Sequence, residues 1–147
     1  MSDDQQTLVL EQLASTSRHV TILSPDLKPQ VLNSAPVVDG LALLARRGRQ
    51  SRIRLLMGHF QPAQMNSHLL VQLARRLTSA VELKVLSEHP QWQGETVILF
   101  DRSSALIWKD TPGASAMLAP RAIAARWHET LEQLWTAADH SPDMRRL

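Results

Sequence analysis

Residues 95–110 read ETVILFDRSSALIWKD and contain two apolar segments separated by a short polar one. The first segment, ETVILF, is almost entirely apolar, which is typical of a strand that is covered on both faces of a sheet. The polar DRSS that follows, residues 101–104, has the composition of a tight connection. We therefore expect two adjacent strands joined as a hairpin, with the first strand in the interior of the sheet.

Upstream of this hairpin, short apolar or β-branched segments alternate with amphipathic ones. Strands are expected at residues 19–24, 52–57 and 81–86, and helices at residues 35–47 and 61–78, with Ser67 a candidate cap for the second helix. Strand–helix–strand units with short connections favour right-handed parallel pairing. The sequence thus predicts an α/β fold with a mixed, mainly parallel sheet flanked by helices.

The two ends of the chain complete this arrangement. Acidic residues precede an apolar pattern that predicts a helix at residues 4–16. Pro120 begins a long amphipathic pattern that predicts a closing helix. We therefore expect an N-terminal helical segment over 1–17, one α/β domain over 18–138 and a flexible tail over 139–147.

The composition limits the class of protein. A chain of 147 residues with 44% hydrophobic and 20% charged residues is the size and composition of one globular domain. It has no cysteine, and no uninterrupted apolar stretch approaches the ~20 residues that span a bilayer. The six histidines lack metal-ligand spacing, and no glycine-rich phosphate loop is present. We expect a cytoplasmic protein without a metal or other cofactor.

Charge is distributed unevenly along the chain. Residues 40–81 contain seven arginines and no acidic residue, so this block is +7 within a chain of net charge +2. Arginine suits phosphate and carboxylate partners because its planar guanidinium can donate two parallel hydrogen bonds. The block therefore indicates an anionic partner, either nucleic acid or a phosphorylated ligand.

The arginines fall at the ends of predicted helices, which leaves two interpretations open. Cations in the last turn of a helix complement its dipole, so they can be simple caps. Two such helices beside a parallel sheet would also end at the same side of the molecule, and their caps would form one patch. The candidate anion-binding residues are Arg46, Arg47, Arg49, Arg75 and Arg76.

Several strings resemble half-domains of the phospholipase D superfamily. LLARRGRQSRIRLLM and LLVQLARRLTSAVELKVL are similar to its helix-to-strand passages, ETVILFDRSSALIWKD to its signature hairpin, and ARWHETLEQLW to its closing helix. The resemblance covers about residues 18–138 and implies a mixed α/β sheet that carries an HxKxxxxD signature. Because half-domains of the family pair through the signature face, it also implies a homodimer.

The signature itself is incomplete in this chain. Aligning its aspartate with Asp101 places Gly94 at the histidine position and Thr96 at the lysine position. The resemblance implies that the nucleophilic imidazole and the phosphate-binding amine are both missing, and that the chain is a catalytically inactive binding or assembly module. Where the family has a small Gly-Ser pair, Trp108 and Lys109 would fill the pocket floor.

Three further readings stay open at this stage. Asp101 can be an ordinary turn residue held by local hydrogen bonds. A hydrolase could instead use a non-standard site in which Asp101, Glu95 and His89 act as the acid and base groups. Trp92 and Trp108 are candidates for a pocket cover or for an interface with a second chain.

Overall fold

One sheet organises the chain in this computed structural model, which describes residues 2–27, 30–58, 67–86, 89–101, 104–108 and 116–140. Within these residues the sheet has seven strands in the order β6-β5-β4-β1-β2-β3-β7. Their bounds are β1 His19–Ser24, β2 Arg52–Met57, β3 Val81–Val85, β4 Thr96–Phe100, β5 Ser104–Trp108, β6 Met117–Leu118 and β7 Asp139–His140.

Parallel pairing is confined to the three strands β1, β2 and β3. The strand β4 runs antiparallel to β1 and also to β5, so ETVILF and ALIWK form the predicted hairpin with β4 in the interior. The two-residue strands β6 and β7 add antiparallel edges. The predicted mixed α/β sheet is therefore confirmed, with its parallel part limited to the strands that are joined by helical crossovers.

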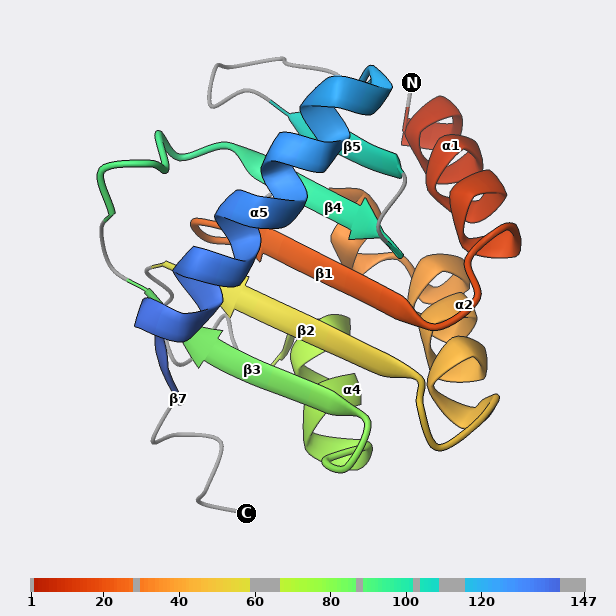
Figure 1. The fold of residues 1–147 in the computed structure, drawn as a ribbon. Helices are drawn as coiled ribbons and strands as arrows, with labels where there is room; N and C mark the ends of the chain where they lie inside the picture. The colour runs from red at the N-terminus through yellow and green to blue at the C-terminus, as the bar shows by residue number, and fades with distance from the viewer. Residues whose placement is uncertain are drawn as a thin grey trace.

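Helices cover both faces of this sheet (Figure 1). The helices α1 (Ser2–Ala14), α2 (Ala35–Arg46) and α4 (Leu69–Arg76), with the short η1 (Gln30–Asn33), form one layer. The single helix α5 (Arg121–Ala137) crosses the other face obliquely. It begins beside β5 and ends near the carboxyl ends of β2 and β3, so the amino-terminal halves of β1, β2 and β3 lie outside its path.

Each strand divides its side chains between two cores because successive residues point to opposite faces. In β1, Val20 and Ile22 join the core under α2 and α4, and Leu23 joins the core under α5. All five residues of β4 are buried because both of its faces are covered. The nearly continuous apolar run of ETVILF is the sequence signal for that position.

Some local predictions are wrong in detail. The cap of α4 is His68, not Ser67, because His68 Nδ1 accepts a hydrogen bond from the Leu70 N–H at 3.2 Å. Asp139 and His140 pair with β3 as strand β7, so the sheet continues into the predicted tail. The rest of that tail, residues 141–147, and the predicted linker at 111–115 lie outside the described residues.

The N-terminal helix belongs to the same core as the domain it precedes. Val9 and Leu13 are buried against α2, and a Cβ atom at Gly40 of α2 would lie only 3.2 Å from Leu13 Cδ1. Glycine therefore permits the close approach of the two helices. In the part of the chain that the structure describes, no helix is long and apolar enough to cross a membrane.

Candidate functional site

Three connections meet at the amino ends of the parallel strands. The segments 15–18, 47–51 and 77–80 lead into β1, β2 and β3, and all three lie on the same side of the molecule (Figure 1). They carry or adjoin a group of arginines that we name the arginine edge. Its exposed members are Arg18, Arg46, Arg47, Arg49, Arg52 and Arg76, and Arg75 is half-buried.

The parallel topology explains why these residues gather. Each crossover helix must run back against its strands, so α2 and α4 both end where the next strand begins. Arg46 and Arg76 are the last residues of these two helices. The structure thus brings the two arginine pairs of the sequence prediction to one side and adds Arg18 and Arg52, which that prediction left out of the site.

Members of the arginine edge differ in how they are held. Arg47 Nη1 donates a hydrogen bond of 2.9 Å to the Thr16 carbonyl and so fastens the end of α1. Arg52 Nη1 donates to the carbonyls of Arg49 and Ser51 at 2.7 and 2.8 Å. The guanidinium groups of Arg46, Arg49 and Arg76 form no hydrogen bond or ion pair with a described residue. Their positive charges therefore face solvent.

A pocket of about 370 Å³ lies beside this edge, between α5 and the amino ends of β1 and β2. In the parallel register, His19 lies opposite Arg52 and Thr21 opposite Arg54, and all four side chains point to the α5 face. Because α5 crosses obliquely, it leaves His19 and Arg52 exposed and Thr21 and Arg54 half-buried. The lining residues are His19, Thr21, Arg52, Arg54, Leu99, Asp101, His128 and Glu132.

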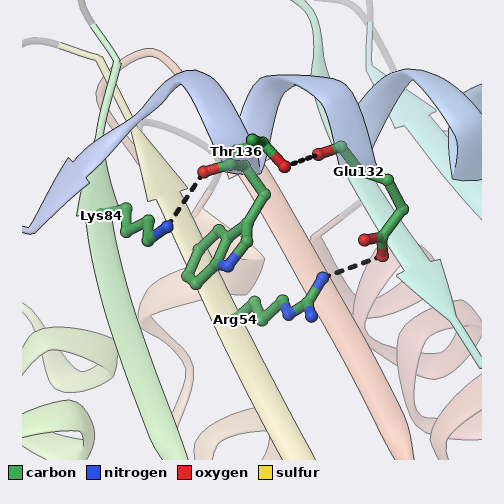
Figure 2. A network of polar contacts seen from close by, with 5 residues as sticks. Arg54, Lys84, Glu132 and Thr136 are labelled. Atoms are coloured by element: carbon green, nitrogen blue, oxygen red, sulfur yellow. Dashed lines mark hydrogen bonds and ion pairs between the residues drawn. The ribbon is translucent and has the colours of Figure 1, made fainter.

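Figure 2 shows how α5 is tied to the sheet at the rear of this pocket. Arg54 Nη1 forms an ion pair of 2.9 Å with Glu132 Oε1, and its guanidinium lies 5.1 Å from the centroid of the Trp135 ring. Lys84 Nζ lies 4.7 Å from the same centroid and donates to the Trp135 carbonyl at 3.0 Å. Two cations therefore interact with the π-system of one indole.

Asp101 connects the β4–β5 turn to the start of β1. Its carboxylate accepts hydrogen bonds from the backbone N–H groups of Ser17, Arg18 and His19 at 2.8, 2.9 and 3.0 Å. Burial alone would raise the pKa of Asp101, but these hydrogen bonds and the nearby His19 imidazole outweigh it and lower that pKa below its ordinary value. The turn position was predictable from the sequence. The partners, more than eighty residues away in the chain, were not.

Gly94 and Thr96 lie at the opposite end of β4 from Asp101. Five residues of extended chain separate Thr96 from Asp101, about 16 Å. Thr96 is buried, and its Oγ1 lies 3.0 Å from Ser24 Oγ. Gly94 has φ 88°, a left-handed conformation that glycine adopts without strain.

The two tryptophans singled out in the sequence lie on different faces of the sheet. Trp92 belongs to the core under α5 and donates from Nε1 to the Glu95 carbonyl at 2.9 Å. Trp108 belongs to the core under α2 and donates from Nε1 to Gln5 Oε1 at 2.9 Å. Both side chains are covered by this chain itself, at 8% and 4% exposure.

The alternative acid–base set is not assembled. Asp101 lies at one end of β4 and Glu95 precedes the other end, about 20 Å away along extended chain. Glu95 accepts the Gln93 N–H, and His89 Nδ1 accepts the Gln91 N–H. Asp101 and Glu95 are close in the sequence but far apart in space, because the segment between them is the extended strand β4. Among the described residues, no three histidine, aspartate or glutamate side chains are grouped so as to hold a metal ion.

The sequence prediction singled out Asp101 but missed the other residues that line the pocket. A usable signal was present, because His19 and Thr21 alternate with buried apolar residues in β1, and Arg52 and Arg54 do the same in β2. Polar residues at alternate positions in two adjacent strands indicate that one face of the sheet is partly exposed there.

Comparison with solved structures places the fold among phospholipase D-like folds. TrmBL2, an archaeal chromatin protein whose structure shows a novel mode of DNA binding, superposes with a TM-score of 0.66 at 10% identity, over 95% of this chain and 51% of that one. NucT from Helicobacter pylori superposes with a TM-score of 0.64 at 7% identity, over 95% of this chain and 92% of that one. This chain therefore spans about half the length of TrmBL2.

Sequence comparison identifies a family without a described activity. No curated protein matches this sequence. One family model, described as "Domain of unknown function (DUF7931)", matches residues 1–147. The chain belongs to the DUF7931 family.

Proposed function

We propose that this chain is a catalytically inactive phospholipase D-like domain that binds nucleic acid through the arginine edge. One observation carries the proposal: three separate connections bring arginines to one side of the sheet, and three of those guanidiniums face solvent without a partner among the described residues. Such a row of charges can neutralise several phosphates of one backbone.

Helix capping alone does not account for the arrangement. A cation in the last turn of each helix is enough to complement the dipole. Arg18, Arg49 and Arg52 lie outside the helices and still join the same side. The carboxyl ends of α2 and α4 carry partial negative charge, which the capping arginines offset. The arginines outside the helices therefore supply the positive charge that attracts a phosphate backbone to this edge.

The proposed inactivity rests on the positions aligned with the family signature. Gly94 has no side chain that could attack phosphorus, and the Thr96 hydroxyl is buried against Ser24. A neutral hydroxyl does not supply the charge that stabilises a phosphoryl-transfer transition state. Trp92 packs near the same end of the sheet, since a Cβ atom at Gly58, which follows β2, would lie 3.2 Å from Trp92 Cη2.

Self-association through the signature strands is not part of this proposal. The family resemblance implies a homodimer, and Trp92 and Trp108 were its candidate contacts. Each of these side chains is buried by the chain itself.

Titration of a labelled DNA duplex at two salt concentrations tests the proposal. We expect binding at low salt that weakens steeply as salt rises, because counterions are released from the neutralised phosphates. The duplex recovered after incubation should be intact, because no nucleophile occupies the Gly94 position. Absence of binding at low salt, or affinity that salt does not change, would refute the binding claim. Cleavage by wild type would refute the claimed inactivity.

A further inference from the structure

The pocket beside the arginine edge has a composition that the proposed function does not use. Its walls carry two arginines and two histidines, from β1, β2 and α5, and its volume of about 370 Å³ falls within the range of small-ligand sites. Thr21 adds a hydroxyl and Leu99 an apolar contact. These groups line one space, and Arg52 belongs both to this space and to the arginine edge.

The two arginines keep donors available for a ligand. Arg54 uses Nη1 for its ion pair with Glu132, and Arg52 uses Nη1 for both of its carbonyl contacts. A guanidinium has five N–H donors in a fixed planar fork, so each of these anchored side chains can still bind oxygen atoms. Because their own contacts already orient the guanidiniums, a ligand loses less conformational entropy in ordering them.

The two carboxylates that line the pocket have partners of their own. Glu132 is paired with Arg54, and Asp101 accepts three backbone N–H groups. His128 Nδ1 is buried in α5 and has no hydrogen-bond partner among the described residues. The ring of His128 also lines the pocket, so it lies next to any ligand that the two arginines hold.

The pocket is closed at its rear. Leu134 and Trp135, which follow Glu132 in α5, pack onto the sheet and close that side of the pocket, so we expect a ligand to enter from the side of Arg52. An internal phosphodiester needs a path in and a path out, whereas a strand end needs one entrance. A terminal phosphate also carries a second negative charge, which suits two guanidiniums.

We propose that this pocket receives a phosphate monoester, the terminal phosphate of a nucleic-acid strand whose backbone lies along the arginine edge. The choice of nucleic acid as the partner rests on the proposed function, whereas the fit of the pocket to a phosphate group does not. A free nucleotide carries the same group, and the experiment below separates the two sources.

Paired oligonucleotides that differ only in a 5′-phosphate test the inference, with a second pair that differs in a 3′-phosphate. We expect one phosphorylated form to bind about tenfold more tightly than its hydroxyl counterpart, as one charge-assisted pair of hydrogen bonds would give. The R52Q variant should lose that preference. The E132Q variant should keep or increase it, because a neutral amide oxygen can still accept the Arg54 hydrogen bond while the competing negative charge is removed. The R76Q variant is the matched control, since it should weaken all forms equally and leave the ratio unchanged.

Adenosine monophosphate separates the outcomes. If wild type binds the phosphorylated and hydroxyl oligonucleotides equally, and R52Q does not change the ratio of their affinities, the inference is overturned and the proposed function stands. If no oligonucleotide binds but the nucleotide binds in wild type and not in R52Q, the phosphate site is supported and the proposed function is overturned. If R52Q fails to fold, the E132Q result alone decides, and loss of the preference in that variant contradicts the inference.

Discussion

The R46Q/R76Q variant is expected to bind duplex DNA at least about tenfold more weakly than wild type at low salt. Each phosphate contact contributes about 0.9 to the slope of log affinity against log salt. Removing two contacts should therefore lower the magnitude of that slope by about 2. Arg46 and Arg76 are exposed and end different helices, so this one variant tests whether the two helix ends act as a single surface.

A matched variant separates local contact from net charge. Arg121 and Arg126 are exposed on α5, whose first turns lie beside β5 and away from the arginine edge (Figure 1). R121Q/R126Q removes the same charge and should reduce affinity much less, with little change of slope. Equal losses in the two double variants would show that overall charge, and not the arginine edge, drives binding. Thermal unfolding of both confirms that neither has lost its fold.

The D101A variant is expected to lose about 3 kcal/mol of unfolding free energy. Three backbone N–H groups lose a charged acceptor, which in this partly exposed position costs about 2 kcal/mol. Asp101 also has φ 51°, a left-handed conformation that disfavours alanine by about 1 kcal/mol. Asparagine tolerates that conformation and keeps one acceptor oxygen, so D101N should lose only about 1 kcal/mol. Urea unfolding at neutral pH measures both.

The pH dependence of stability gives a second readout for the same residue. The pKa of Asp101 is lowered on folding, so its contribution is fully present above the unfolded pKa of about 3.9 and disappears as pH falls through the folded value. D101N should lack this part of the acid destabilisation. D39N, at an exposed aspartate of α2, is the control and should keep it. An unchanged acid profile in D101N would contradict the role assigned to the carboxylate.

The strands and crossover helices were predictable because each has a clear local signal. Short β-branched or apolar segments marked β1 and β2, strict alternation marked β3, and an apolar run marked β4 as a strand covered on both faces. Parallel topology alone predicted that the arginine pairs at the ends of the two helices would lie on the same side of the molecule. Local signals could not predict long-range contacts, such as the hydrogen bonds from the backbone of Ser17, Arg18 and His19 to Asp101.

The sequence marked the polar strand positions but could not predict the pocket itself, because the pocket depends on the path of one helix. His19, Thr21, Arg52 and Arg54 are polar positions on strands, and periodicity alone does not say which part of a sheet a helix leaves open. The oblique crossing of α5, anchored by Trp135 and the Arg54–Glu132 ion pair, decides that. Asp101 and Glu95 of the alternative hydrolase set are separated for a related reason, since the strand β4 lies between these two residues that are close in sequence.

Backbone amide shifts in the isotope-labelled protein during titration with a short DNA duplex test the central claim most directly. The account predicts that the largest changes occur in the connections 15–18, 47–51 and 77–80, at the amino ends of β1, β2 and β3. Residues 94–97, at the far end of β4, should remain unchanged. Changes concentrated at 94–97, with the three connections unaffected, would place the contact at the positions aligned with the phospholipase D signature and contradict the account.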